Sequence, residues 1–433
     1  MANVLRARWR NLIEGLWFVP LLIVLGMGVL AVALVRLDEN LIGHSTPWVF
    51  GGNASAARVV LSTIAGSLIT VAGLTFSVTM VVLQLASSQF SPRVLPNFLA
   101  DRLTQVTVGA FVGIFVFCLI GLRAVGGRHE LVPRLTVTVA SGLGVVAVIL
   151  LIAFIHHVST MIQVSHIAAR IGRRTLQQLD VLYPRSYGEE AEQEGGTLLE
   201  QWRQDGDPAR ILPPRPGYVQ EVDLDALART YAGGGVRLHV PVAPGDFAGV
   251  GTAIVEVWPA DAAAGCETAT TRTVTIASER TFAQDVDFGV RQLTDIALRA
   301  ISPAVNDPTT AVTCIGYVRS VLERLAGRDF PSRVRRWPDD DVVVVARRRA
   351  FDEHLELLLQ LAPYSNGDAR VIGALLDACR ATAVAAREAG ADGRATAVLD
   401  VAEQIAAATL EEVRTRHDRR RVEELLSEVR AVY

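Results

Sequence analysis

The sequence predicts a membrane domain of about four transmembrane α-helices followed by a C-terminal cytoplasmic α+β region. Three observations lead to this fold class. Residues 1–160 contain four long windows without Asp, Glu, Arg or Lys, each able to cross a hydrocarbon core of about 30 Å. Residues 161–433 are charged like a soluble domain, with thirty-two Arg against forty Asp or Glu. Short strand patterns and turn signals accompany this change in composition.

The four predicted spans lie at approximately residues 17–35, 64–90, 104–122 and 135–157, within a transmembrane domain of residues 1–160. The first span is not a signal peptide, because its apolar run is long and three further spans follow it. Basic residues near the span ends place both termini in the cytoplasm. One loop opposes this orientation, since it carries Arg123, Arg128 and Arg134 with only Glu130.

The second span carries small and polar residues at steps of three, four or seven, which places them on one side of a helix. This polar stripe consists of Gly66, Thr70, Gly73, Ser77, Gln84 and Ser88. One interpretation is close helix packing, as for the Gly109-x-x-x-Gly113 pair of the third span. The other is that copies of this helix line a water-filled path in a homo-oligomer. No ionisable residue lies deep in a span, so a passive pore is favoured over an ion-coupled carrier.

Residues 161–212 are predicted to form a helical stalk and linker, after which a small β-rich module occupies residues 213–260. Strand patterns at 217–222, 236–242 and 253–258, a short helix and the turn Pro244-Gly245-Asp246 define this module. The order of its elements is similar to barrel-sandwich modules of the biotinyl or lipoyl type. The carrier function of such modules is excluded here, because the sequence contains no Lys to modify.

Residues 261–433 are predicted to be a mainly helical cytoplasmic domain. One helix has a charged stripe and an apolar face, and a Ser-Pro pair ends it. An Asp-Pro pair then predicts the start of the next helix, with the carboxylate as N-cap. Capping and surface ion pairing explain these polar residues. The alternative is a ligand or subunit contact made by Arg291, Asp295, Arg299, Asn306 and Asp307.

Three further patterns occur in this domain. A strand is predicted at 342–345, between three Asp at 339–341 and three Arg at 347–349. Such charge blocks usually coat a solvated face, and a partner-binding patch is the alternative. Asp285 and Asp287 begin a helix, where the helix dipole favours carboxylates. A long Ala-rich helix is predicted near residues 395–430.

Three stretches carry a resemblance to a known family: residues 74–95 in the second span, the Gly-Asp-Phe turn at 245–247, and FGVRQLTDIALRAISPAVNDPTTA at 288–311. Through them the chain resembles the bacterial family of predicted membrane proteins named for domain of unknown function 2254. The similarity covers most of the chain. It implies a multi-span inner-membrane protein with a cytoplasmic C-terminal portion, and it implies no catalytic or binding residues.

The sequence predicts no enzyme. All 42 basic residues are Arg, which excludes lysine-dependent chemistry, and the common hydrolase, metalloprotease and nucleotide-binding motifs are missing. The four cysteines lie far apart, as expected of free thiols in a reducing compartment. No metal site or cofactor is predicted, and His156, His157 and His166 at the end of the fourth span are attributed to a juxtamembrane role or to packing. The acidic second half disfavours a nucleic-acid partner.

Two functional hypotheses remain. The first is a homo-oligomeric, channel-like or passive transport protein whose cytoplasmic domain regulates it. Its partners are the lipid bilayer, further copies of the chain, and an ion or small solute. The alternative is a non-conducting membrane scaffold or sensor that recruits a cytoplasmic partner.

Overall fold

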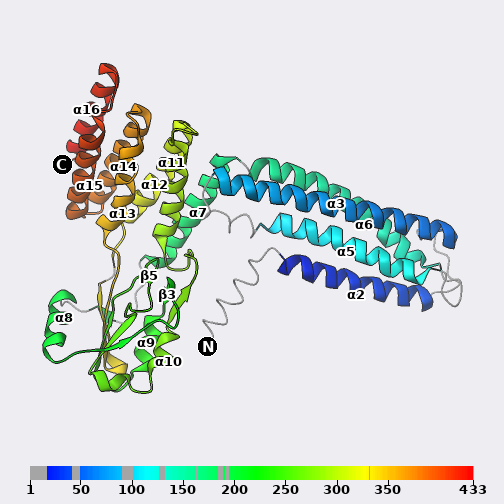
Figure 1. The fold of residues 1–433 in the computed structure, drawn as a ribbon, viewed down its shortest axis with the longest axis horizontal. Coiled ribbons are helices and arrows are strands. Elements are labelled where there is room, and N and C mark those ends of the chain that lie inside the picture. Colours follow the sequence, from blue (N-terminus) through cyan, green and yellow to red (C-terminus); the bar gives the residue numbers. More distant parts are fainter. Residues whose placement is uncertain are drawn as a thin grey trace. The chain divides into compact units, whose positions relative to one another are not determined.

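The computed structural model describes residues 17–40, 49–89, 101–125, 132–161, 163–183, 189–190, 195–330 and 332–432. Two compact units make up the chain: an N-terminal unit that ends at His166 and a C-terminal unit that begins at Ile167 (Figure 1). Each unit has its own buried core.

The N-terminal unit contains four helices that are long and apolar enough to cross a membrane. They are α2 (Phe18–Asn40), α3 (Ala54–Gln89), α5 (Arg102–Ala124) and α6 (Arg134–Met161). Helix α3 begins before the predicted start at 64, because the Asn53 side chain accepts a hydrogen bond from the Ala56 amide (2.9 Å) and caps it. It continues unbroken through Gly73.

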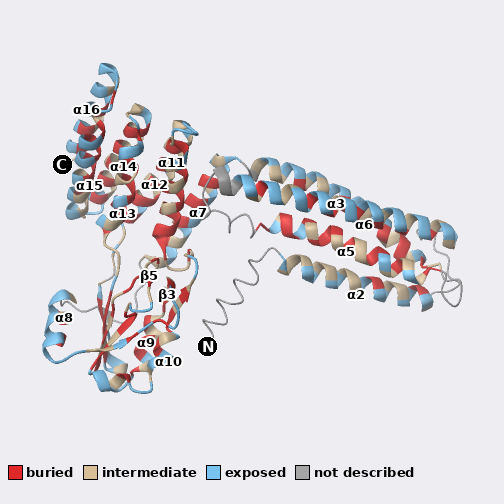
Figure 2. Cartoon of the chain, viewed as in Figure 1, coloured by how far each residue is buried: buried red, intermediate tan, exposed pale blue. Residues whose placement is uncertain are grey.

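Helix α5 lies at the centre of this unit, in contact with α2, α3 and α6. Its Phe111, Ile114 and Phe117 side chains are buried, and Figure 2 shows α5 as the most buried of the four helices. Asp38, near the end of α2, accepts hydrogen bonds from the Leu135 amide (2.9 Å) and the Thr136 amide (3.0 Å). This carboxylate therefore caps α6 and joins the ends of two helices.

The C-terminal unit contains two open sheets. One has the strand order β1-β8-β9-β4-β6-β2 and the other β5-β3-β7. All neighbours are antiparallel except β4 and β9, which run parallel. The strands are β1 (Glu189–Glu190), β2 (Ala209–Ile211), β3 (Gly217–Val222), β4 (Val236–Val240), β5 (Phe247–Ala248), β6 (Val255–Trp258), β7 (Val274–Ala277), β8 (Val334–Trp337) and β9 (Val342–Ala346).

The predicted barrel-sandwich-like unit of residues 213–260 is not formed, since the described strands close no barrel. The strands themselves occur where the patterns predicted them, and β4 pairs with β6 and β3 with β5 inside the module, but each also pairs with a strand outside it. Strand β4 pairs with β9, with Leu238 opposite Val344, and β3 pairs with β7. Alternation along β4 buries Val236, Leu238 and Val240 in a core shared by both sheets. A local pattern identifies a strand but not the distant strand that covers its edge.

The helices of the C-terminal unit fall into two groups. Short ones accompany the sheets: α8 (Gly195–Gln204), α9 (Leu224–Thr230), α10 (Glu267–Thr271), η2 (Ala260–Ala263) and η3 (Pro338–Asp340). The second group packs side by side: α7 (Val164–Leu182), α11 (Val286–Ala300), α12 (Pro308–Ala326), α13 (Phe351–Leu359), η4 (Ala362–Tyr364), α14 (Ala369–Glu388), α15 (Asp392–Thr409) and α16 (Arg416–Arg430) (Figure 1).

Two of these helices replace the single long helix predicted near 395–430, which was wrong. The chain leaves α15 after Thr409, and α16 starts at the N-cap Thr415, whose hydroxyl accepts from the Asp418 amide (3.0 Å). Helix α7, in the predicted stalk, packs within the C-terminal unit: a Cβ at Gly172 would lie 2.6 Å from the Tyr317 ring.

Candidate functional site

The polar stripe lies on the side of α3 that faces away from the other helices. Gly66, Thr70, Gly73, Ser77 and Gln84 are all exposed; the side chain of Ser88 lies outside the described residues. The opposite side of α3 is buried in the core of the unit through Ala57, Leu61, Ala65, Leu68 and Ala72. At 100° per residue these two sets lie on opposite sides of the helix.

Packing against the chain's own helices does not explain the glycines of the stripe. A Cβ added at Gly66 or Gly73 would meet nothing within 4 Å. The glycine pair of α5 differs, because a Cβ at Gly109 would lie 2.8 Å from Pro20 Cα, and one at Gly113 would lie 3.0 Å from Met27 Cγ. Close packing inside one chain therefore uses the glycines of α5.

The hydroxyls of the stripe are satisfied by their own helix. Thr70 Oγ1 donates to Gly66 O and Ser77 Oγ donates to Gly73 O, both at 2.9 Å. Such bonds let a hydroxyl sit in an apolar environment, while both lone pairs of each hydroxyl oxygen stay available to a donor.

One histidine at the end of the fourth predicted span has a polar partner. His157 Nε2 lies 2.9 Å from Asp101 Oδ2, and the same carboxylate accepts from the Thr104 amide as the N-cap of α5. The pair therefore sits at a helix end, and it ties the start of α5 to α6. Among the described residues, no group of three or more His, Cys, Asp or Glu could hold a metal ion.

The five predicted contact residues are distributed over α11 and the turn that follows it. Asp307 caps α12 as predicted: it accepts from the Thr310 amide (3.1 Å) and hydroxyl (2.6 Å), and this bonding lowers the pKa of the Asp307 carboxyl. Asn306 has a left-handed backbone (φ 49°), and Arg291 donates to Gln360 (3.1 Å). Asp295 is half-buried and Arg299 is exposed. A ligand or subunit contact at these residues stays a prediction.

A buried charge cluster at the start of α11 was not recognised from the sequence. Asp285 caps the helix through the Phe288 amide (3.1 Å) and pairs with Arg280 (2.6 Å). Asp287 instead pairs with Arg349 (2.7 Å) and accepts a short hydrogen bond from His354 Nδ1. The exposed fraction is only 3 % for each of Asp285, Asp287 and His354. Because one N-cap carboxylate suffices, the second Asp of this Asp-x-Asp pair was the signal that could have revealed the cluster.

The turn Pro244-Gly245-Asp246 completes this cluster. Asp246 accepts from Arg347 (2.8 Å) and Arg349 (3.2 Å). Gly245 has φ 92°, and a Cβ there would lie 2.5 Å from Asp285 Oδ2, so only glycine allows this approach. The arginine block at 347–349, predicted to coat a solvated face, thus supplies two partners for aspartates far away in the sequence.

The pKa values of Asp285 and Asp287 are shifted in opposite directions from the usual value of an aspartate. Burial raises the pKa of Asp285 to about 6, against the lowering effect of Arg280. Burial also acts to raise the pKa of Asp287, but His354 and Arg349 outweigh it and hold that pKa below its usual value. Burial, with Asp287 nearby, raises the pKa of Tyr183 to about 12. Asp287 is therefore the fixed negative charge of the cluster.

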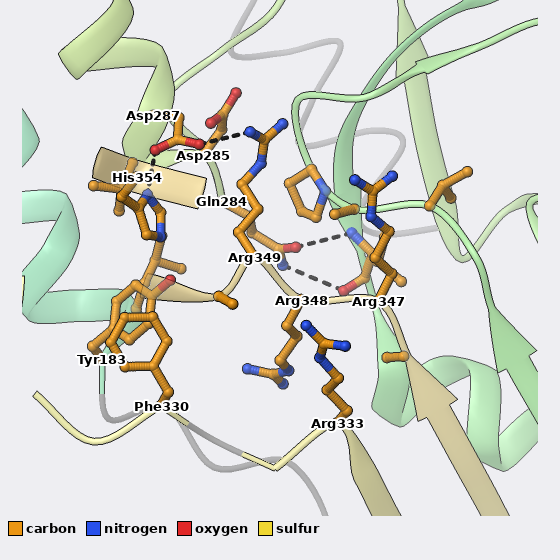
Figure 3. Close-up of a pocket in the computed structure, with 18 of the residues that line it drawn as sticks. Tyr183, Gln284, Asp285, Asp287, Phe330, Arg333, Arg347, Arg348, Arg349 and His354 are labelled. Carbon is orange, nitrogen blue, oxygen red and sulfur yellow. Dashed lines mark hydrogen bonds and ion pairs between the residues drawn. The ribbon is translucent and has the colours of Figure 1, made fainter. Parts of the chain in front are cut away.

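A cavity of about 340 Å³ opens beside the cluster, between the sheets and the second group of helices (Figure 3). Its walls are apolar on the side of β3, α9 and β4, and aromatic where Tyr183, Phe330 and Phe351 lie. Five arginines line it, against two aspartates: Arg333, Arg347, Arg348, Arg349 and Arg394, against Asp285 and Asp287.

The family model described as predicted membrane protein (DUF2254) matches residues 14–381 of the chain. The chain belongs to this family. The four apolar helices and the whole cavity of this DUF2254 protein, except Arg394, lie within the matched residues.

Relatives of this DUF2254 protein occur in mycobacteria. It is 34 % identical over 344 residues to an uncharacterized protein of Mycobacterium bovis and, equally, to one of Mycobacterium tuberculosis. The matches cover 77 % of this chain and 65 % of each relative, so the chain spans just under two thirds of their length. No solved structure matches the chain.

Proposed function

We propose that this DUF2254 protein assembles into a homo-oligomer in the bacterial inner membrane and forms a channel-like, passive path across it. The observation that carries this proposal is the outward position of the polar stripe on α3. Helices that contact one another in a bilayer do so through small and hydroxyl residues, whereas side chains toward lipid are large and apolar. A second copy of α3 is the partner that such a surface fits best.

The flanks of the polar stripe support this arrangement. Ile69 and Phe76 are exposed on one side of it, and Leu74 and Val81 on the other. Large apolar side chains beside a row of small residues suit a contact whose edges face lipid. Thr70, Ser77 and Gln84 would then offer oxygen and amide groups to a solute at the contact. With both termini in the cytoplasm, the C-terminal unit would regulate the path.

The assembly is tested by cysteine crosslinking of the full-length protein in membranes. Ser77→Cys is expected to form a disulfide-linked dimer on mild oxidation. The matched variant Ala72→Cys, on the buried side of the same helix, is expected to stay monomeric. The native cysteines are free, and Cys118, Cys314 and Cys379 are buried. Equal crosslinking of both variants, or of neither, would contradict an α3 contact.

Conduction is tested with the purified protein in planar bilayers. The wild-type protein is expected to conduct, and a positively charged methanethiosulfonate reagent should block Ser77→Cys while leaving Ala72→Cys and the wild type unchanged. If Ser77→Cys crosslinks but no conductance appears at any voltage, tension or pH, the proposal of a channel is wrong, whereas the proposal of a homo-oligomer stands.

The second candidate function is a non-conducting sensor or scaffold, and the arginine-lined cavity of the C-terminal unit favours it. Crosslinking and affinity purification of the full-length protein from its membrane should then recover one consistent soluble partner. Failure to recover such a partner under several growth conditions would count against this function.

A further inference from the structure

The cavity beside the charge cluster has the dimensions of a small-molecule site. Its volume of about 340 Å³ falls within the range of about 300–1,000 Å³ that is usual for ligand pockets. Val222, Leu224, Val240 and Val242 form one apolar wall. Aromatic rings face the cavity elsewhere, with the Phe330 ring centroid 6.3 Å from that of Phe351. The interior can therefore hold an apolar or planar body.

The lining holds five arginines and two carboxylates, and both carboxylates are already engaged. Arg347 and Arg349 are paired with Asp246, so the excess of positive charge comes from the other three arginines. Asp285 and Asp287 are bound to Arg280, Arg349 and His354, as described above. Arg394 donates to two backbone carbonyls, of Ala326 (2.8 Å) and Arg328 (2.6 Å), and its guanidinium lies over the Phe330 ring, 4.7 Å from the centroid. No ion pair joins Arg394 to a carboxylate among the residues that the structure describes. The cavity thus attracts an anion.

Two guanidinium groups lie together at the edge of this cavity. Figure 3 shows the side chains of Arg333 and Arg348 ending close to one another, although one precedes β8 and the other follows β9. Arg333 is exposed, and no ion pair joins it to a carboxylate in the part of the chain that the structure describes. Each guanidinium can bind a phosphate through two parallel hydrogen bonds, and two such groups side by side can bind the same phosphate.

Buried polar atoms on the cavity wall also point to a ligand. His354 Nε2 and Arg349 Nε are buried and have no hydrogen-bond partner among the described residues. The His354 ring is oriented by the bond from its Nδ1 to Asp287, which leaves Nε2 on the ring edge away from that carboxylate (Figure 3). A buried polar atom without a partner destabilises the fold, so a ligand that bonds to Nε2 would remove this penalty.

We propose that this cavity binds a small phosphate ester. Arg333 and Arg348 hold the phosphate at the edge, the apolar and aromatic walls enclose the body of the ester, and His354 Nε2 hydrogen-bonds to a polar group on that body. The site does not depend on the proposed channel, because all of its residues belong to the C-terminal unit. The same chemistry is present in a soluble metabolite and in the headgroup of a phospholipid.

The proposal is tested by calorimetric titration of the full-length protein in detergent. The probes are adenosine monophosphate, dihexanoyl phosphatidate, inorganic phosphate and citrate. We expect one of the two esters to bind at least tenfold more tightly than inorganic phosphate or citrate. Binding of the nucleotide identifies a soluble source, and binding of the phosphatidate identifies a lipid source.

Two cavity variants and one control complete the test. Arg333→Gln should weaken binding of the ester at least tenfold. His354→Gln should weaken binding of the ester more than it weakens binding of inorganic phosphate. Arg419→Gln, an exposed arginine of α16 far from the cavity in sequence, should bind like the wild type. Equal thermal unfolding of Arg333→Gln and wild type excludes misfolding. Binding of neither ester, preference for citrate, or equal weakening by Arg333→Gln and Arg419→Gln would overturn the proposal.

Discussion

Helices α3 and α5 both carry glycines at helical spacing, yet the two sets have different surroundings. Those of α5 lie against α2, where Gly109 leaves no room for a Cβ beside Pro20. Those of α3 face open space in a single chain. The same sequence pattern therefore has two meanings, and the position of the helix within its bundle decides which one applies. A central helix uses small residues to let its neighbours approach, whereas those on the outward side of α3 form the surface that we propose contacts a second copy of the chain.

The largest effect is expected from a leucine at Gly109. Its Cβ alone would approach the α2 backbone at Pro20 Cα to 2.8 Å, and backbone cannot yield by a side-chain rotation. Overpacking of a tight contact costs about 1–3 kcal/mol, and we expect Gly109→Leu to reach or exceed the upper value. Thermal unfolding in detergent measures the loss.

Gly66→Leu is the matched control for that variant, since nothing lies within 4 Å of a Cβ at Gly66. It should unfold at the temperature of the wild-type monomer. If both variants lost the same stability, the contrast between α3 and α5 would be wrong.

A smaller effect, confined to assembly, is expected from Gly73→Leu. The single chain has space for this leucine side chain, but a second copy of α3 packed on the polar stripe would leave no space for it. Light scattering after size-exclusion chromatography should show a shift from oligomer to monomer with little change in unfolding of the monomer. Gly142→Leu is the control, because Gly142 is an exposed glycine of α6 with equally open surroundings. An oligomer unaffected by Gly73→Leu, or lost equally in Gly142→Leu, would place the contact elsewhere.

Much of the architecture followed from local pattern. Uncharged windows predicted the four apolar helices, alternation predicted β3 at 217–222, and the Asp307-Pro308 pair predicted the start of α12. Each of these features depends on residues close together in the chain: hydrophobic period, a cap or a proline. The positions of strands and helices were therefore accessible without knowledge of tertiary contacts.

The candidate cavity was not accessible in this way, because its parts meet only in the folded chain. Asp287 looked like an ordinary carboxylate at a helix start, and Arg349 looked like part of a solvated block. Their ion pair joins residues 62 positions apart. The parallel pairing of β4 with β9 brings the arginine block to the turn at 244–246, and a period-two pattern contains no information about that partner. For the same reason the sequence could not show that the polar stripe faces outward.

The smallest effect is expected from a comparison of the exposed and the buried side of α3, made with variants of Thr70 and Thr75. Each hydroxyl donates to its own backbone four residues earlier, Thr70 to Gly66 O and Thr75 to Val71 O, but Thr70 is exposed and Thr75 is buried against the bundle. Valine keeps the shape of threonine and has a methyl group in place of the hydroxyl, so each variant should change stability by about 0.6 kcal/mol or less. Conductance should distinguish them: Thr70→Val removes a polar group from the proposed path and should lower single-channel conductance, whereas Thr75→Val should leave it unchanged. A decrease in Thr75→Val alone would mean that any path runs inside the bundle of one chain, and the outward stripe would then serve assembly only.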